Sequence, residues 1–251
     1  SQWPYIVLRY PDNNDYKIFY PTDVMETAGD LVFFWVARMI MLGLYVTNKI
    51  PFKTVYMHGM VLDAKSQKMS KSKGNVIDPL TYTEQFGTDA FRMGMIVGNT
   101  PGTSLALSPD KIKGYKNFAN KIWNITRFIL DNTEKGSFEN FVQNKLTKEF
   151  NEIRDNITSD MENYRFHLAS EKIYQYIWHR FADEIIEETK EIIKTGGEKA
   201  KERKTTLALI WIDCLKILHP FMPFVTEEIW SRMPARSSGG FLKNKNLLMV
   251  E

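Results

Sequence analysis

Hydrophobic and polar residues follow two different patterns along the chain. Up to about Asp110, short apolar runs of two kinds succeed one another. The run LVFFWVARMIMLGLYV, residues 31–46, is strongly apolar, which predicts a buried helix. The run TVYMHGMVL, residues 54–62, is rich in β-branched and aromatic residues, which predicts a strand. Helices and strands mixed in this way predict an α/β region.

Helix start signals occur twice in this part of the chain. Asp78-Pro79 combines an N-cap residue with proline at the first helical position, and Gly87 supplies a stop, so a short helix is expected between them. Ser108-Pro109 repeats the start signal. From there apolar residues recur at steps of three and four, which predicts a long amphipathic helix; they are Ile112, Tyr115, Ala119, Ile122, Ile125 and Ile129.

Every later periodic stretch has the helical spacing. The longest, residues 170–194, ends at Gly196-Gly197, and the charged residues that follow, 196–204, are expected to form a connector. Thr226 is a candidate N-cap for a last helix, and residues 236–246 are expected to form a loose tail. The sequence therefore predicts two domains: residues 1–110, a partial Rossmann-like α/β region, and residues 111–251, an all-α helical bundle.

Charge and cysteine content narrow the class of protein. The formal net charge of +3 lies entirely on the helical half, and a total so small does not by itself indicate nucleic-acid binding. Cys214 is the single cysteine, which excludes an internal disulfide or a zinc site of several thiolates. No uninterrupted apolar run reaches 18 residues, so neither a membrane span nor a signal peptide is expected. We predict a cytoplasmic protein.

The lysine loop, defined here as QKMSKSKGNVIDP at residues 67–79, carries the most distinctive chemistry. Its lysines stand among small residues, so the backbone can approach a ligand closely. Ammonium groups, serine hydroxyls and backbone N–H groups together suit a polyphosphate whose negative charge increases in a transition state. On composition alone, an ordinary solvated basic loop is the more common explanation. The order of the residues changes that balance.

The segment Lys68-Met69-Ser70-Lys71-Ser72 resembles the KMSKS signature of class I aminoacyl-tRNA synthetases, and Lys73 to Pro79 continue the pattern of the valine, leucine and isoleucine members. Upstream, FYPTDVMETAGDLVFFWVARMI and PFKTVYMHGMVLDA are similar to the valyl-tRNA synthetase family in particular. Downstream, GTDAFRMGMIVGNTPG and LHPFMPFVTEEIW continue the likeness in order. The resemblance covers nearly the whole chain.

The resemblance implies an ATP site and a valine pocket. In the family, the signature lysines stabilise the phosphates of ATP while the amino-acid carboxylate attacks the α-phosphorus and pyrophosphate leaves. The resemblance assigns the catalytic role to Lys68 and Lys71. It also assigns Trp35 to the wall of the valine pocket; the alternative is that Trp35 is an ordinary core tryptophan. Mg²⁺ would be carried by the phosphates, with no protein metal ligands. The implied ATP-binding residues are Lys68, Ser70, Lys71, Ser72, Asp30, His58 and Gly59.

The helical half resembles the family's anticodon-binding bundle, which implies tRNA(Val) as a partner. Basic residues alternate with aromatic ones on its first long helix, which suits phosphate contacts combined with stacking on unpaired bases. The alternative places the aromatic rings in the core and the charges in solvent. Residues 87–92 resemble an element that contacts the inside of the tRNA, although their charges could simply cap a helix. The implied tRNA-binding residues are Lys113, Lys116, Lys121 and Arg127.

Other parts of the family's pattern are missing from this sequence. None of the four histidines stands in a His-Ile-Gly-His-like signature, and no editing domain is recognisable. We therefore expect the chain to be a C-terminal part of a synthetase that lacks the N-terminal catalytic half and the editing domain, and to be inactive alone. A stand-alone tRNA-binding module and one subunit of a split synthetase are the alternatives. The first residue, Ser1, favours a cut chain over a natural split.

Overall fold

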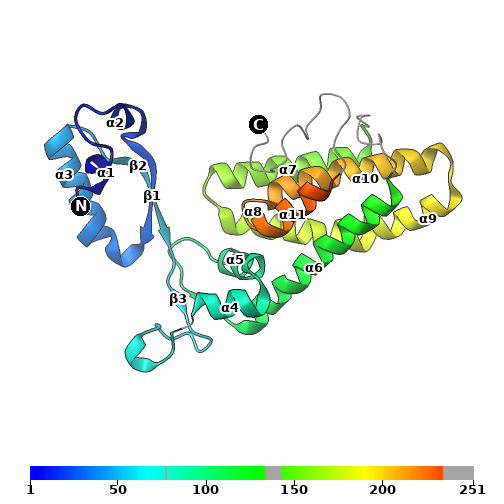
Figure 1. Ribbon diagram of the computed structural model, residues 1–251, viewed down its shortest axis with the longest axis horizontal. Coiled ribbons are helices and arrows are strands. Elements are labelled where there is room, and N and C mark those ends of the chain that lie inside the picture. Colours follow the sequence, from blue (N-terminus) through cyan, green and yellow to red (C-terminus); the bar gives the residue numbers. More distant parts are fainter. Residues whose placement is uncertain (77, 134–142, 234–251) are drawn as a thin grey trace. The chain divides into compact units, whose positions relative to one another are not determined.

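A computed structural model describes residues 1–76, 78–133 and 143–233, except for the side chain of Lys71 (Figure 1). The chain separates into two compact units. The N-terminal unit consists of Ser1–Gly74 and Asn99–Ala106, and the helical unit of Asn75–Gly98 and Leu107–Glu251. Packing thus assigns Asn75–Gly98, from within the lysine loop onward, to the helical unit, whereas the boundary that we predicted from sequence falls near residue 110.

The N-terminal unit is a small α/β arrangement. Strands β1 and β2 are parallel, with Thr22 opposite Phe52 and Ala28 opposite His58, and helix α3 connects them (Figure 1). Two short strands, β3 and β4, form a second parallel pair. The elements are α1 (Trp3–Ile6), α2 (Asn14–Phe19), β1 (Thr22–Ala28), η1 (Gly29–Leu31), η2 (Val32–Val36), α3 (Ala37–Thr47), β2 (Phe52–His58), β3 (Val61–Leu62), η3 (Lys71–Lys73) and β4 (Leu105–Ala106).

The apolar run 31–46 is helical, as predicted, but the prediction that it is buried is wrong. Only 17% of the most apolar 18 residues within Gly29–Thr47 are buried in this chain. Val36 and Met39 face a small core with Phe52, while Phe33 is 79% exposed. The run has no continuous polar face that would show which side of the helix meets water, so its burial could not be predicted from the sequence pattern.

The same segment is relevant to a membrane location. By length and composition, Gly29–Thr47 is the one helical stretch among the described residues that could cross a membrane, which the sequence analysis did not anticipate. One such stretch is weak support for a membrane location, because apolar helices of water-soluble proteins meet the same criterion. Its charged residues Asp30 and Arg38 also lie within the segment.

All the regular elements among the described residues of the helical unit are helices (Figure 1). A single run from α8 through η4 to α9 stops at Gly196, as the glycine pair predicted. The elements are α4 (Pro79–Phe86), α5 (Thr88–Ile96), α6 (Pro109–Asn132), α7 (Lys145–Glu162), α8 (Phe166–Gln175), η4 (Tyr176–Ile186), α9 (Glu187–Thr195), α10 (Gly197–Leu218) and α11 (Pro223–Arg232).

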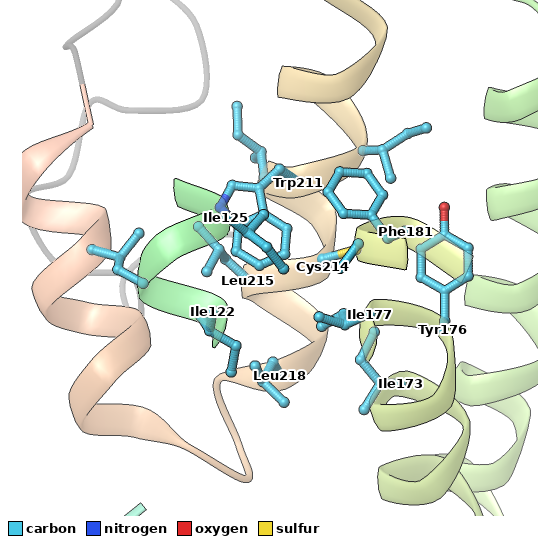
Figure 2. Packing of buried hydrophobic residues seen from close by; sticks show 14 of the residues in the cluster. Ile122, Ile125, Ile173, Tyr176, Ile177, Phe181, Trp211, Cys214, Leu215 and Leu218 are labelled. Carbon is cyan, nitrogen blue, oxygen red and sulfur yellow. The ribbon is translucent and has the colours of Figure 1, made fainter. Parts of the chain in front are cut away.

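Side chains from α6, η4 and α10 form the centre of the core (Figure 2). Trp211 is fully buried and stacks on Phe181 with ring centroids 5.5 Å apart. Its indole nitrogen donates to the Thr126 hydroxyl at 3.0 Å, so the one polar atom of the ring has a partner. Cys214 lies in the same core, where burial raises the pKa of its thiol well above the ordinary value. Such a thiol is inert at neutral pH.

Two helix starts follow the local signals in the sequence. The Asp78 carboxylate accepts a hydrogen bond from the Leu80 nitrogen at the start of α4. The Ser108 hydroxyl accepts one from the Lys111 nitrogen at the start of α6. Both helices therefore begin where the N-cap and proline signals predicted.

Two other local predictions are wrong. Residues 197–204 are not a connector, because α10 begins at Gly197 and includes them. Thr226 is not an N-cap: it lies within α11, where its hydroxyl donates to the Met222 carbonyl. The predicted tail, residues 236–246, lies outside the described residues.

Candidate nucleotide and RNA sites

The lysine loop joins β3 to α4 and is held at both ends by short-range hydrogen bonds. Before it, the Asp63 carboxylate accepts hydrogen bonds from the backbone nitrogens of Lys65 and Gln67 at 2.9 and 2.8 Å. At its end, Asp78 caps α4. Asx turns and N-caps of this kind fix the path of the backbone on both sides of a loop.

Within the loop, serine side chains organise a single 3-10 turn, Lys71–Lys73. The Ser70 and Ser72 hydroxyls lie 3.2 Å apart, and the backbone nitrogen of Lys73 donates to the Ser70 hydroxyl at 3.3 Å. Gly74 follows with φ of 64°, a left-handed conformation that glycine adopts without steric cost. The loop therefore has a defined turn followed by a permissive residue.

The structure describes the side chain of only one of the two predicted catalytic lysines, Lys68. Lys68 is exposed, just after the residues of the Asp63 turn. The side chain of Lys71 lies outside the described part of the structure, although its backbone opens the 3-10 turn. Ser70 is half-buried and Ser72 exposed. Their assignment to ATP phosphates stays a prediction.

The predicted adenosine contacts lie at the carboxyl ends of the parallel strands β1 and β2, where α/β sheets bind ligands. His58 ends β2 opposite Ala28, the last residue of β1, and Asp30 follows two positions later. The His58 ring nitrogen Nδ1 pairs with the Glu26 carboxylate on β1. The sequence analysis did not include Glu26 among the residues near the predicted adenosine contacts. Glu26 lies two residues before Ala28 and therefore on the same face of β1, and this spacing could have placed it beside His58.

Gly59 is required by close backbone contact. A Cβ atom at this position would lie 1.3 Å from the Thr103 carbonyl oxygen. The segment that carries Thr103 continues into β4, which pairs with β3. Gly59 therefore allows two chain segments to pass each other, whatever ligand its backbone also contacts.

Trp35, predicted for the valine pocket, lies in the wide helical turn η2 and is 39% exposed. It is accordingly not a core tryptophan of the N-terminal unit. Its neighbours Phe33 and Phe34 are 79% and 64% exposed and meet edge to face. The three consecutive aromatic side chains thus present a large apolar surface of this unit.

The four basic residues predicted on α6 fall into two groups. Lys113 and Arg127 are exposed. Lys116 donates to the Gln85 carbonyl at 3.1 Å, at the end of α4. Lys121 pairs with Asp183 at 2.7 Å and lies 4.2 Å from the centre of the Trp178 ring. Two of the four are therefore already engaged within the helical unit.

The aromatic residues on α6 belong mostly to the core, as the simpler alternative had it. Phe118 is fully buried. Tyr115 packs edge to face against Tyr174, and burial raises its pKa to about 12. Trp123 is half-buried beneath the Arg232 guanidinium, 5.1 Å from the ring centre.

A groove between α6 and the η4–α9 helix combines amides, charges and one aromatic ring. We call it the α6 groove; its volume is about 390 Å³. Asn117, Asn120 and Asn124 line one wall at helical spacing, with Phe128 in the same wall. Amide groups can both donate to and accept from base edges, and a ring can stack on a base. Sequence analysis missed the asparagines, although their spacing of three and four was visible.

Helix α5 is attached to both sides of the turn between α10 and α11. The Asp89 carboxylate accepts hydrogen bonds from the backbone nitrogens of Phe224 and Val225, at 3.2 and 2.6 Å. Arg92 donates to the carbonyls of Pro220 and Phe221, at 2.9 and 3.3 Å. The first pair compensates the positive end of α11 and the second the negative end of α10. These charges thus cap helices, the alternative that the sequence left open.

Comparison with known proteins identifies the family. Residues 1–108 match the family model described as tRNA synthetases class I (I, L, M and V). Residues 143–251 match the model described as anticodon-binding domain of tRNA ligase. The lysine loop falls within the first match, and much of the helical unit within the second. The chain belongs to the class I tRNA synthetases.

Curated relatives narrow the family further. The chain is 44% identical to a valine–tRNA ligase of Pelagibacter ubique over 237 residues, covering 91% of this chain and 27% of that protein. It is 41% identical to a valine–tRNA ligase of Clostridium tetani, with the same coverage of 91% and 27%. Within its class, the chain is thus a segment of the valine–tRNA ligase kind, and it spans about a quarter of the length of these relatives.

Solved structures support the fold. A LeuRS of Agrobacterium radiobacter K84, solved in a ternary complex with tRNA and LeuAMS, matches with a TM-score of 0.72 and 19% identity, covering 93% of this chain and 31% of that one. A methionyl-tRNA synthetase of Mycobacterium tuberculosis, in complex with methionyl-adenylate, matches with a TM-score of 0.70 and 19% identity, covering 89% and 47%. At this identity the likeness concerns the fold alone. It confirms the predicted class I architecture.

Proposed function

We propose that this chain is the part of a complete valine–tRNA ligase that supplies the lysine loop, part of the valine and ATP sites, and the anticodon-binding helices. The observation that carries the proposal is the lysine loop itself, a strand-to-helix connection held at both ends, with Lys68 exposed between them. In the complete enzyme, valine and ATP react to valyl-adenylate and pyrophosphate, and the valyl group is then transferred to tRNA(Val).

The lysines act by placing positive charge. As the valine carboxylate attacks the α-phosphorus, negative charge increases on the departing pyrophosphate. Lys68 and Lys71 stabilise that charge more than they stabilise ground-state ATP, which lowers the barrier. Ser70 and Ser72 shape the turn that positions them, since their hydroxyls lie 3.2 Å apart.

The strand ends supply the rest of the small-molecule site. Asp30 binds the ribose hydroxyls, the His58-Gly59 segment contacts adenine, and Trp35 forms a wall for the valine side chain. Their positions support these assignments. His58 is the last residue of β2, and Gly59 follows it. Asp30 and Trp35 lie in η1 and η2, the two turns that follow β1. The described residues hold no group of three or more His, Cys, Asp or Glu side chains that could ligate a metal. We expect Mg²⁺ to be bound through the ATP phosphates.

The helical unit reads unpaired bases of tRNA(Val). The α6 groove offers amides for base edges and Phe128 for stacking, and Lys190 lies on its opposite wall. Lys113 and Arg127 are exposed on the same helix and suit phosphate contacts. Lys116 and Lys121 would have to give up contacts inside the protein to bind phosphate.

The exposed apolar surface of the N-terminal unit indicates that other parts of the enzyme cover it. Phe33, Met41 and Tyr45 are 79%, 68% and 86% exposed. Patches of this kind on a protein mark contact surfaces. The relatives' greater length leaves room for the remaining catalytic half and an editing domain. We place the complete enzyme in the cytoplasm and expect this chain alone not to form valyl-adenylate.

Binding of labelled tRNA(Val) and of a non-cognate tRNA to the purified chain, across a salt series, tests the proposal together with ATP–pyrophosphate exchange. We expect preference for tRNA(Val) and no exchange. Asn120→Ala and Asn124→Ala should each weaken tRNA(Val) binding roughly tenfold, the cost of losing a base contact. Asn156→Ala, on α7, is the matched control and should bind as the parent does.

Three results would contradict it. Equal binding of both tRNAs would contradict recognition of the anticodon by the helical unit. Full affinity in the α6 groove variants would move the tRNA to another surface. Valine-dependent exchange by the chain alone would mean that no missing half is needed, and would favour a subunit with its own active site.

A further inference from the structure

Most glycines of the described residues have a structural reason inside this chain. Gly43, Gly59 and Gly94 lie so close to other residues that a Cβ atom would come within 3.0, 1.3 and 3.3 Å of them. A second group has positive φ, which glycine adopts without steric cost; it consists of Gly74, Gly87, Gly98, Gly102, Gly196 and Gly197. Among the glycines that the structure describes, only Gly29 and Gly114 have neither reason.

Of these two, Gly114 is the one that the proposed sites do not account for. Gly29 lies next to Asp30, in the proposed ATP site. Gly114 lies in the interior of α6 and is exposed, and no other part of the described chain comes within 4 Å of its Cβ position. Alanine would fit there and would stabilise the helix, because glycine is among the least favourable residues in a helix interior. The absence of a side chain at this position therefore indicates a requirement from outside this chain.

Gly114 continues the α6 wall of the α6 groove. That wall includes Asn117, Lys121, Asn124 and Phe128, at alternating steps of four and three residues. Gly114 precedes Asn117 by three residues, so it lies on the same face of the helix. The helical rise places it about 5 Å from Asn117 along the axis of α6. A ligand that fills the groove and extends toward the start of α6 therefore passes over Gly114.

The surroundings of Gly114 suit a nucleic acid better than a protein. Helix α6 is described over its full length, and none of its large apolar side chains is exposed, whereas protein contact surfaces centre on such side chains. Lys113 is exposed beside Gly114, at one end of the polar stripe. Arg127 is exposed beside Phe128, at the other end. Cations at both ends match a phosphate backbone that runs along the stripe.

One acidic residue lies near this position. Asp110 is exposed, one turn before Gly114. It belongs to the first turn of α6, where a carboxylate interacts favourably with the positive end of the helix. Its charge is thus explained by the helix itself and does not extend the stripe that lines the groove.

We propose that Gly114 is the position at which the sugar–phosphate backbone of a bound RNA passes closest to α6. Lys113 contacts a phosphate there, and the absence of a Cβ atom lets the strand lie against the helix. The inference rests on the proposed function, because it takes tRNA as the ligand of the α6 groove. It adds a contact that does not depend on base sequence.

Substitutions at Gly114 test this close approach, with binding of labelled tRNA(Val) and of a non-cognate tRNA to the full chain. Gly114→Ala should weaken binding about threefold and Gly114→Gln at least about tenfold, because a larger side chain occupies more of the space that the strand needs. Both tRNAs should lose affinity by the same factor, since a backbone contact carries no sequence information. Asn120→Ala, in contrast, should reduce the preference for tRNA(Val).

Thermal unfolding separates this effect from damage to the helix. Alanine and glutamine are better helix formers than glycine, so both variants should unfold at a higher temperature than the parent. Weaker binding together with higher stability is a result that a purely structural role of Gly114 does not produce. Ser159→Gln, at an exposed position of α7, is the control for added side-chain size and should bind both tRNAs within about twofold of the parent.

The outcomes distinguish this inference from the function on which it rests. If the parent chain binds no tRNA, the proposed function fails and the inference fails with it. If the parent prefers tRNA(Val) and Gly114→Gln binds with full affinity, the inference alone is overturned, and the space beside Gly114 serves another part of the complete enzyme. A loss confined to tRNA(Val) also overturns it, because the contact would then be made to bases. Weaker binding accompanied by lower thermal stability in both variants overturns it as well.

Discussion

The carboxylate of Asp89, on α5, lies 2.6 Å from the backbone nitrogen of Val225, in the first turn of α11. The two residues are separated by 136 positions in the sequence. An N-terminal helix turn has backbone N–H groups without partners inside the helix, and here a side chain from a distant helix supplies the acceptor. The position that appeared to be the local cap, Thr226, instead bonds to His219 and Met222 within the core.

Removing the Asp89 carboxylate should destabilise the helical unit. Asp89→Ala leaves two N–H groups of α11 without an acceptor, and we expect a loss of about 1–2 kcal/mol in the free energy of unfolding. Asp89→Asn should cost less, because its side-chain oxygen still accepts one of the two bonds. Urea unfolding followed by circular dichroism measures both. Equal losses in the two variants would show that the hydrogen bonds do not set the stability of this contact.

The same residue predicts a pH dependence. Burial raises the pKa of Asp89 above its ordinary value of 3.8, against the hydrogen bonds from Val225 and Phe224. Because the folded pKa exceeds the unfolded one, its contribution to stability is fully present below the unfolded pKa and is lost as pH rises through the folded pKa. Asp89→Asn cannot ionise, so it should gain stability relative to the parent as pH rises from about 4 to about 7. A gap that moves in the opposite direction would contradict the raised pKa.

Asp160 should behave in the opposite way. It is 3% exposed, and Lys172 and Arg165 lie 2.6 and 2.8 Å from its oxygens, across the turn from α7 to α8. Burial opposes its charge, but hydrogen bonds from these two cations outweigh it, so the net pKa is lowered. Its contribution is present above the unfolded pKa and is lost as pH falls through the folded pKa.

We therefore expect Asp160→Asn to lower the free energy of unfolding at pH 7 by about 2 kcal/mol. The difference from the parent should shrink below about pH 4. Thermal unfolding at several pH values measures this. Glu191→Gln, which removes an exposed partner of Lys194 on α9, is the control and should change stability by less than about 0.5 kcal/mol. A difference that is constant down to pH 2 would rule out the charge as its source.

Two glycine substitutions should have opposite effects. Gly59→Ala places a Cβ atom 1.3 Å from the Thr103 carbonyl oxygen, so the β3–β4 pair must separate. We expect a loss of about 3 kcal/mol or more in the stability of the N-terminal unit. Gly114→Ala, on α6, meets no atom within 4 Å and should stabilise the helical unit by about 0.5–1 kcal/mol. Hydrogen exchange at β3 and α6 distinguishes the two units; unchanged exchange at β3 in Gly59→Ala would contradict the contact.

Local signals predicted the elements next to the candidate sites correctly. Asp78-Pro79 and Ser108-Pro109 start helices because each cap bonds to nitrogens only two or three residues away. The order of residues in the lysine loop indicated the family, which the comparisons then confirmed. The periodic apolar positions of α6, such as Ile122 and Ile125, all proved to be buried or half-buried.

Other features depended on residues far apart in the sequence. From the sequence, Lys116 and Lys121 are expected on an exposed basic face of α6. In the structure each has a partner on another helix: Lys116 contacts Gln85, and Lys121 contacts Asp183. The α6 groove exists only where α6 meets η4 and α9, so no single helix pattern could reveal it. The start of α11 needed Asp89.

The sequence by itself thus determined the starts of α4 and α6 and the apolar stripe of α6, because short-range hydrogen bonds and helical periodicity act within a few residues. Tertiary structure decided which charges are neutralised, which helix end is capped from a distance, and that the apolar segment of α3 remains exposed in this chain. Those outcomes depend on the surface that each side chain meets, and that surface comes from another part of the fold or of a longer protein.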